Sequence, residues 1–157
     1  EERDFKLYEI ICKTLKKKGF IHYEISNFAK KGFESKHNLT YWNNEEYYGF
    51  GVGASGFVEA IRYENTKSLT EYLKGNFISS KSLMSKVDNM ENELILGFRK
   101  LEGINLNHFF DKFEENMQNI FPIKPLIKSK DLIYKNGYIY INPKKLYIMN
   151  EILIKLI

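Results

Sequence analysis

The sequence has little cysteine and proline and no long apolar run: its 157 residues include one cysteine, three prolines and one tryptophan. The single thiol, Cys12, excludes an internal disulfide, a CxxC zinc site and an iron–sulfur cluster held by this chain's cysteines alone. No stretch reaches the roughly 18 apolar residues of a membrane span, and the acidic start lacks the layout of a signal peptide. These absences favour a reducing, cytoplasmic setting.

The composition nevertheless provides enough apolar side chains for a folded core. Hydrophobic residues make up 43% of the sequence, which at this length suffices for one ordinary domain or two small ones. The 24 basic and 20 acidic residues give a net charge of +4 and are spread along the chain. The field that would attract nucleic acid or anionic lipid is therefore modest, and we interpret the lysines mainly as a solvated surface.

The first 26 residues predict a helix followed by a strand. Apolar side chains recur at helical spacing over residues 5–15, and three lysines follow. Cys12 lies on this stripe, where we expect a small buried hydrophobic residue. Residues 20–26 alternate as in a strand, and its polar face carries His22 and Glu24. The apolar face comprises Ile21, Tyr23 and Ile25. This is half of an α/β unit, so we expect partner elements before the first residue.

The middle of the chain is less regular. Residues 27–56 have little periodicity but many aromatic residues and glycines, which indicates an ordered, irregular segment. Residues 57–63 predict a strand. Ser68 and Glu71 form a capping box for a short helix, and the polar stretch 79–85 is the best domain boundary. The side chains expected to face inward from that short helix are Leu69, Tyr72 and Leu73.

The last half of the chain predicts helices and one hairpin. A first helix begins near Asp88, a second runs from Leu106 to Pro122, and a short third helix covers residues 126–130. The first stripe comprises Val87, Met90, Leu94, Ile95, Phe98 and Leu101. The second comprises Leu106, Phe109, Phe110, Phe113 and Met117. Each stripe is spaced to bury one face of its helix.

A hairpin and a closing helix complete the pattern. Residues 132–135 and 138–141 flank Asn136-Gly137, a strong hairpin signal, and Asn142 with Pro143 suits the start of a last helix. The buried side of that helix comprises Met149, Ile152, Leu153 and Leu156. Three helices, a hairpin and a closing helix are typical of a winged-helix arrangement.

The most conspicuous motif, GVGASG at residues 51–56, formally matches the GxGxxG dinucleotide fingerprint. That fingerprint requires a preceding strand and a following helix, whereas a strand is expected to follow here, so we reject dinucleotide binding. Two interpretations remain open. The glycines form a purely structural tight turn, or they let the backbone approach a ligand or another segment closely.

Histidines supply the other candidate chemistry. His37 lies in HNLTYW, and its imidazole could ligate haem iron beside the rings of Tyr41 and Trp42. The alternative is a histidine hydrogen-bonded within a structured loop. His22 and Glu24 could line a pocket if their strand belongs to a barrel, or form an exposed edge face.

No nucleophile set is recognisable in the sequence. There is no credible Ser-His-Asp or Cys-His set, and the spacing of His22, Glu24 and His37 matches no metal motif. We expect His108 to be a surface or capping residue.

The motifs YEISNFA, HNxxYW and Y-x-GxGxGA occur in this order between Tyr23 and Ala54. Together they resemble the oxygen-independent coproporphyrinogen III oxidase-like radical-SAM family, especially its haem chaperone branch. The segment ELILGFRKLEGINL and the tail INPKKLYIMNEILIKLI resemble that family's C-terminal domain. The resemblance therefore covers nearly the whole chain.

The resemblance implies an α+β fold in three parts. Residues 1–30 would be the last helix and strand of a partial (β/α) barrel, residues 31–80 a connecting segment, and residues 81–157 a winged-helix-like domain. In the family, a 4Fe–4S cluster on a CxxxCxxC motif binds beside S-adenosylmethionine. Those cysteines are absent here, and the chain does not begin with Met. We therefore expect the C-terminal part of a longer protein, without catalysis of its own.

The resemblance also implies a site for haem or porphyrin. It makes His37 the metal ligand, and the resemblance together with the motifs above gives a further set of cofactor-binding candidates. These are Glu24, Asn38, Tyr41, Trp42, Gly51 and Gly53. The family commonly has Pro where Lys31 stands and often has His where Ser55 stands, and the second difference removes an imidazole from the site.

Three functions follow as hypotheses. The first is a haem chaperone, which would bind haem and deliver it to haem-accepting proteins, with no nucleic acid as partner. The enzymatic alternative is oxidative decarboxylation of coproporphyrinogen III by the intact parent protein. The alternative from another class is a winged-helix nucleic-acid-binding or protein-interaction module, suggested by Lys124, Lys128 and Lys130.

Overall fold

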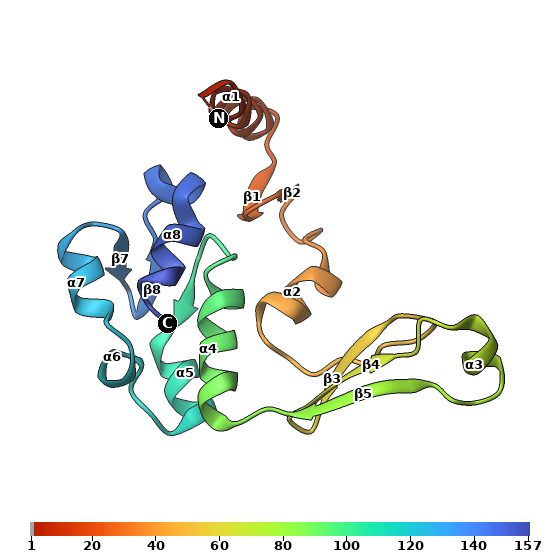
Figure 1. Cartoon of the computed structure of the whole chain (residues 1–157). Helices are drawn as coiled ribbons and strands as arrows, with labels where there is room; N and C mark the ends of the chain where they lie inside the picture. The colour runs from red at the N-terminus through yellow and green to blue at the C-terminus, as the bar shows by residue number, and fades with distance from the viewer. Residues whose placement is uncertain (1) are drawn as a thin grey trace.

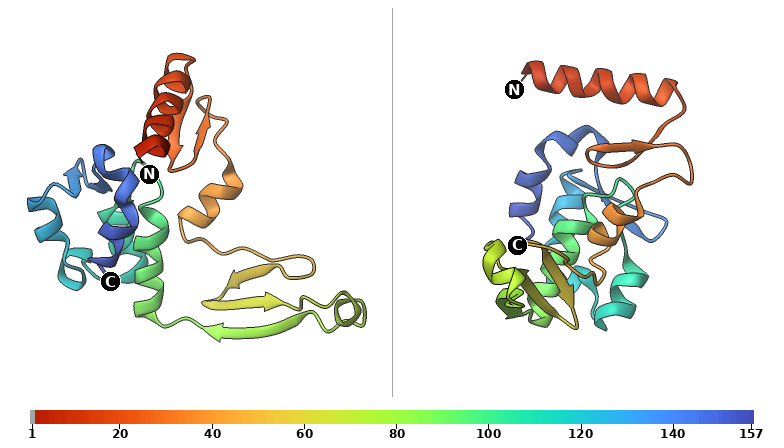
Figure 2. Two further views of the ribbon diagram at one scale, coloured as in Figure 1. Left: turned by 45° about the horizontal axis from the view of Figure 1, so that its top comes forward. Right: turned by 90° about the vertical axis from the view of Figure 1, so that its right-hand side faces the viewer.

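The computed structural model describes residues 2–157 as a mixed α and β chain in three spatial groups (Figure 1). The first group contains α1 (Glu2–Lys17) and a hairpin of β1 (Ile21–Glu24) and β2 (Asn27–Ala29). After α2 (Lys36–Trp42), a three-stranded arm projects away from a compact C-terminal group of helices (Figures 1 and 2). None of the helices in residues 2–157 has the length and apolar character needed to cross a membrane.

The predicted first helix is present and begins earlier than residue 5. It contacts the C-terminal group at Phe5, whose ring centroid lies 5.4 Å from that of Tyr147. Much of its apolar surface is exposed, with Ile10 58% and Ile11 49% accessible. Cys12 is only partly buried, so its predicted role as a buried core residue is wrong. Too few of the described residues pack against this helix to cover its apolar side chains.

The predicted strand 20–26 is shorter and turns back on itself. Its faces also differ from the prediction, because Ile21 is 43% exposed and Glu24 is 1% exposed. The hairpin explains this difference. His22 stacks on Phe28 with ring centroids 4.2 Å apart, and Glu24 accepts a hydrogen bond from Asn27. A buried carboxylate is tolerated when its own turn supplies donors.

The segment HNLTYW forms helix α2 and not the irregular structure that its sequence suggested. Ser35 is the N-cap, and its hydroxyl accepts a hydrogen bond from the amide of Asn38 at 3.3 Å. The helix contacts α4 (Lys86–Gly97), one of the core helices. His37 therefore lies on a capped helix, and its predicted alternative as a loop residue is wrong.

The arm is an antiparallel sheet in the order β3 (Ser55–Val58), β4 (Ile61–Asn65) and β5 (Ile78–Leu83). The predicted strand 57–63 is wrong, because the chain reverses at Glu59 and Ala60. Both have positive φ, 52° and 60°, as a type I′ hairpin turn requires. The polar stretch 79–85 lies mostly within β5. The division of the chain at residues 30 and 80 stays a prediction.

The helix α3 (Leu69–Leu73) lies at the far end of the arm (Figure 1). Half of the predicted capping box is present, since the Ser68 hydroxyl accepts a hydrogen bond from the amide of Glu71 at 3.3 Å. The other half is wrong, because the Glu71 carboxylate accepts from Lys74 and Asn76. The predicted inward orientation is wrong for two of the three apolar residues. Leu69 is 61% and Leu73 77% exposed, because no layer of this chain covers that side of the helix.

The C-terminal group contains α4 and a small sheet surrounded by short helices. The remaining elements are β6 (Ile104–Asn105), α5 (Leu106–Phe113), α6 (Met117–Ile120), α7 (Ile123–Lys128), β7 (Leu132–Lys135), β8 (Tyr138–Ile141), η1 (Pro143–Ile148) and α8 (Met149–Ile154). The sheet order is β6-β8-β7, all antiparallel. The predicted hairpin is confirmed to the residue, with Asn136 and Gly137 both at positive φ.

The hydrophobic core lies within this group. Its buried members are Met90, Leu94, Phe98, Ile104, Phe109, Phe113, Met117, Phe121, Ile123, Leu126, Leu132, Ile139, Ile141, Met149, Ile152, Leu153 and Leu156. Most predicted stripe residues are among them, but Val87 and Phe110 are exposed. The second predicted helix is split, because Glu114 adopts a left-handed conformation after α5. Gly97 allows Ile104 to approach, since a Cβ there would lie 2.5 Å from its side chain.

Candidate functional site

A chain of aromatic contacts begins at His37 on α2. The imidazole of His37 meets Tyr41 edge-on at 4.8 Å, and Tyr41 meets Tyr47 at 4.5 Å. Tyr47 in turn exchanges two backbone hydrogen bonds with Phe57 of β3, at 2.8 and 2.9 Å. His37 is exposed, and within residues 2–157 its ring makes no hydrogen bond or ion pair. Its ring nitrogens are therefore available to a ligand.

Trp42 is the last residue of the same helix, but its side chain contacts neighbours outside this chain of aromatic contacts. The guanidinium of Arg99 lies 5.3 Å from its ring centroid, and its indole Nε1 is buried without a hydrogen-bond partner among the described residues. Asn38 lies one turn earlier, and its backbone amide donates to the hydroxyl of the N-cap residue Ser35. Three of the predicted residues, His37, Asn38 and Tyr41, thus share α2 with Trp42, and α2 is the element that brings them together.

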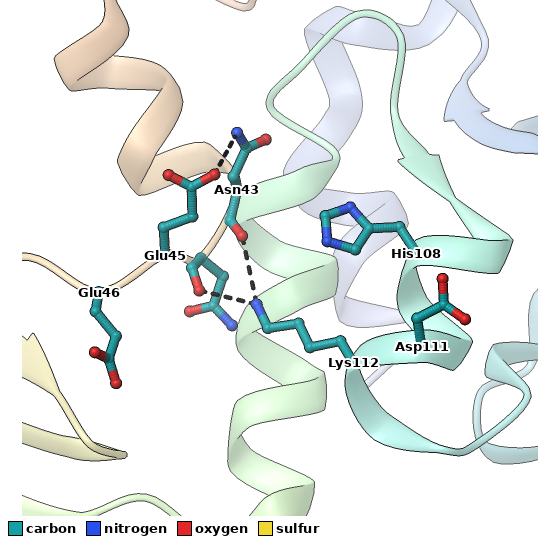
Figure 3. A pocket seen from close by; sticks show the side chains of 7 residues that line it. Asn43, Glu45, Glu46, His108, Asp111 and Lys112 are labelled. Carbon is teal, nitrogen blue, oxygen red and sulfur yellow. Dashed lines mark hydrogen bonds between the residues drawn. The ribbon is translucent and has the colours of Figure 1, made fainter.

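A cavity of about 420 Å³ lies where the end of α2 faces α5 (Figure 3). His108, Asp111 and Lys112 project toward it from α5, opposite Asn43 and Glu45. The ammonium of Lys112 donates to the carbonyl oxygen of Asn44 at 2.9 Å. His108 is an exposed residue, as predicted, and does not cap the helix, because Asn105 does so.

Buried polar groups connect this cavity to the core helix α4. The Nδ2 of Asn44 donates to Oδ1 of Asn89 at 2.7 Å and to Oε2 of Glu93 at 3.3 Å. Lys100 donates to Oδ1 of Asn43 at 2.6 Å, and burial lowers the pKa of its ammonium. These long-range contacts fix the C-terminal end of α2, and no sequence pattern indicated them.

A second cavity, of about 300 Å³, lies between α2, α4 and the arm. It is lined by Tyr41, Asn44, Glu45, Tyr47, Ser55, Phe57, Arg62, Glu64 and Leu96. Burial raises the pKa of Tyr47, an effect that the nearby charge of Arg62 partly offsets. The sequence motifs pointed to Tyr41 and Ser55, but the remaining walls of this cavity were not predicted, because they come from separate elements.

Gly51 and Gly53 lie elsewhere, in a loop packed against the α3 end of the arm. The amide of Gly51 donates to the hydroxyl of Tyr72 at 3.0 Å, and its carbonyl accepts from Asn65 at 2.9 Å. The amide of Gly53 donates to the carbonyl of Thr66 at 2.9 Å. Both glycines have positive φ, as a tight turn requires. Within the described residues, the hydrogen bonds of these two glycines stabilise the loop, and none of them involves a residue of α2.

Glu24 is also separate from His37. Its carboxylate accepts hydrogen bonds from Asn27 and from the amide of Ser26, both within its own hairpin. His22 contacts the carbonyl oxygen of Ile25 at 3.2 Å. In the part of the chain that the structure describes, no three His, Cys, Asp or Glu side chains are grouped so as to hold a metal ion.

Comparison with known proteins identifies the family. No family model matches the sequence. Haem chaperone HemW from Lactococcus lactis is 39% identical over 157 residues, which is 97% of this chain, and HemW from Bacillus subtilis is 35% identical over 160 residues. This chain belongs to the HemN/HemW radical-SAM-like family. A more distant relative is the mitochondrial radical S-adenosyl methionine domain-containing protein 1 of Danio rerio, 32% identical over 130 residues.

The fold of this HemN/HemW family member agrees with that assignment. The Escherichia coli coproporphyrinogen III oxidase HemN, described as a radical SAM enzyme, superimposes with a TM-score of 0.64 over 94% of this chain at 14% identity. The chain covers 41% and 42% of the two bacterial HemW sequences and 39% of HemN. It thus spans about two fifths of its relatives' length and corresponds to their C-terminal part.

Proposed function

We propose that this chain forms the haem-binding part of a HemW-like haem chaperone, in which His37 would hold the iron. The observation that carries the proposal is the exposed imidazole on α2, held edge-on by Tyr41 and free of hydrogen bonds in residues 2–157. The names of the two most fully matched relatives, haem chaperone HemW, agree with this function. In this proposal, Asn38, Tyr41 and Trp42 surround the ligand position.

The residues present fit haem better than an iron–sulfur cluster. A neutral imidazole is a common axial ligand of haem, and aromatic rings pack well against a flat macrocycle. When bound, haem would supply an iron that coordinates the ring nitrogen of His37. One cysteine cannot hold a 4Fe–4S cluster. We therefore assign the cluster and S-adenosylmethionine of the family to the part of the relatives that this chain does not match.

The finer features of the fold belong to the same proposal. We infer that residues 81–157 form a winged-helix-like domain, with β7 and β8 as the wing, and that residues 1–30 end a barrel. Oxidative decarboxylation of coproporphyrinogen III by a longer parent protein is the enzymatic alternative within this family. In either case the proposed partners are haem or porphyrin and, for a chaperone, haem-accepting proteins in the cytoplasm.

The proposal is tested by titrating haem into the 157-residue chain and into two histidine variants. We expect a Soret shift with the unmodified chain and with His108→Ala, which removes another exposed imidazole. His37→Ala should bind at least about tenfold more weakly or give a different spectrum, because one axial ligand is lost. Identical spectra and affinities for all three proteins would contradict the role of His37.

The salt dependence of the affinity distinguishes haem binding from the nucleic-acid alternative. Lys124, Lys128 and Lys130 are exposed on and after α7, but the comparisons do not support nucleic-acid binding. Affinity for phosphates would fall steeply as salt rises, whereas iron coordination would be largely insensitive to salt.

A further inference from the structure

Arg62 on β4 is half-buried, and its guanidinium has no hydrogen-bond or ion-pair partner among residues 2–157. Its Nε is shielded from solvent and has no hydrogen-bond acceptor, and no carboxylate of the described residues lies within 4 Å of it. Its guanidinium lies 5.9 Å from the ring centroid of Phe57, and its charge acts on the nearby hydroxyl of Tyr47. Buried polar groups in native proteins are almost always hydrogen-bonded, so this arginine requires an explanation.

The cavity around Arg62 combines one cation with aromatic walls. Tyr41, Tyr47 and Phe57 supply rings, Leu96 of α4 supplies an aliphatic wall, and Arg62 supplies the charge. Tyr41 is also the residue that contacts His37. The cavity therefore lies beside the proposed haem ligand and is connected to it through a single ring.

The size and charge of the cavity narrow the class of ligand. Its volume of about 300 Å³ is at the lower end of the range for small-molecule pockets, which suits a substituent better than a whole macrocycle. Glu45 and Glu64 also line it, and their charges oppose a multiply charged phosphate more strongly than a singly charged carboxylate. A single carboxylate is planar and matches the fork of a guanidinium.

We propose that Arg62 binds a carboxylate arm of the porphyrin whose iron His37 ligates, and thereby selects carboxylated porphyrins. This inference rests on the proposed haem-binding function and extends it to a second contact on another element. His37 on α2 and Arg62 on β4 would then hold the two chemically distinct parts of one ligand. The three-stranded sheet that carries Arg62 is thus part of the binding site.

The test compares haem with haem dimethyl ester, which has no free carboxylate. Both are titrated into the unmodified chain, Arg62→Gln and Lys81→Gln, a control that removes a positive charge from the neighbouring strand β5. Arg62→Gln should weaken haem binding roughly 10- to 100-fold, the equivalent of a charge-assisted hydrogen bond. Binding of the ester should be the same for all three proteins.

Two results would overturn the inference. The first is haem binding that is equal in Arg62→Gln and Lys81→Gln, and the second is an equal loss for haem and its ester in Arg62→Gln. If His37→Ala still loses haem in either case, the proposed function stands and only the role of Arg62 fails. Absence of haem binding by the unmodified chain would overturn both proposals.

A second variant tests whether the loss of haem binding in Arg62→Gln has a purely structural cause. Arg62→Lys keeps the charge above Phe57 but lacks the planar fork, so it should bind haem with an affinity between those of the unmodified chain and Arg62→Gln. Thermal unfolding of each variant shows whether the fold is retained. Equal haem affinity of a folded Arg62→Lys and a folded Arg62→Gln would count against a carboxylate contact.

Discussion

The ammonium of Lys112 on α5 lies 2.7 Å from the carboxylate of Glu93 on α4, and the same ammonium donates to the carbonyl oxygen of Asn44 at 2.9 Å. Glu93 also accepts a hydrogen bond from the side chain of Asn44. Two core helices therefore clamp Asn44, which lies two residues after the end of α2. Because Tyr41 lies three residues before Asn44, this clamp also sets the position of the candidate site.

We expect the Lys112–Glu93 pair to stabilise the fold more than an exposed ion pair does. Glu93 is buried, so a double-mutant cycle with Lys112→Met and Glu93→Gln should give a coupling energy of about 1–2 kcal/mol. The matched control is the pair Lys86–Glu115, whose side chains are 54% and 45% exposed. Its coupling should be under about 0.5 kcal/mol. Equal couplings, measured by urea unfolding, would contradict the clamp.

Gly56 on β3 is predicted to be intolerant of a side chain. A Cβ at this position would lie 2.1 Å from the ring of Tyr63, whose hydroxyl accepts a hydrogen bond from the amide of Gly49 at 2.9 Å. Gly56→Ala should therefore displace the ring and destabilise the chain by about 1–3 kcal/mol. Gly75→Ala is the comparison, because a Cβ there meets no atom and only its positive φ of 91° costs stability. A smaller loss for Gly56→Ala than for Gly75→Ala would refute the steric argument.

Asp131 makes the stability sensitive to acid. Hydrogen bonds from Lys145 and Ser129 hold the pKa of its carboxyl below the usual value. The resulting stabilisation is complete above the ordinary pKa of about 4 and is lost as the pH falls through the lowered value. Asp131→Asn should therefore be less stable than the unmodified chain at pH 7, and the difference should shrink below about pH 4.

The measurement is the free energy of unfolding from pH 7 to pH 3. Lys145→Met should remove part of the same acid-sensitive stabilisation, because it deletes the main donor to Asp131. A difference between Asp131→Asn and the unmodified chain that is constant across this range would show that the carboxylate is not stabilised by its partners.

His22 should also make the stability sensitive to acid, but because its ring is partly buried and not because of hydrogen bonds to a charged form. Its partly buried ring stacks on Phe28, and burial lowers its pKa below the ordinary value of about 6.5. The unfolded chain then binds the proton more readily, so stability should fall as the pH drops below about 6.5. The ring resonance that disappears in His22→Gln should titrate below pH 6.5 in NMR spectra. A midpoint at or above 6.5 would contradict this assignment.

Local signals in the sequence predicted the elements that local chemistry determines. Asn136 and Gly137 adopt positive φ readily, and the hairpin around them has the predicted bounds. By contrast, the turn between β3 and β4 is made by Glu59 and Ala60, which carry no turn signal. The sequence was therefore interpreted as one strand where the chain forms two.

The candidate site was predictable only in part, for a related reason. His37 and Tyr41 are four residues apart on one helix, and a short motif identified both. Lys112 and Asn44 are separated by 68 positions, and Arg62 reaches the site across a sheet whose topology was not predicted. Such contacts depend on tertiary packing and leave no periodic pattern in the sequence.

The placement of the core has a consequence for the order of folding. Every buried member of the core cluster lies between residues 90 and 156, so the core closes no loop longer than this segment and should form before the contacts to the arm and the first helix. During synthesis the core residues are also made after the arm and the first helix. The arm and the first helix, with their exposed aromatic and aliphatic side chains, must therefore wait for the surface on which they dock.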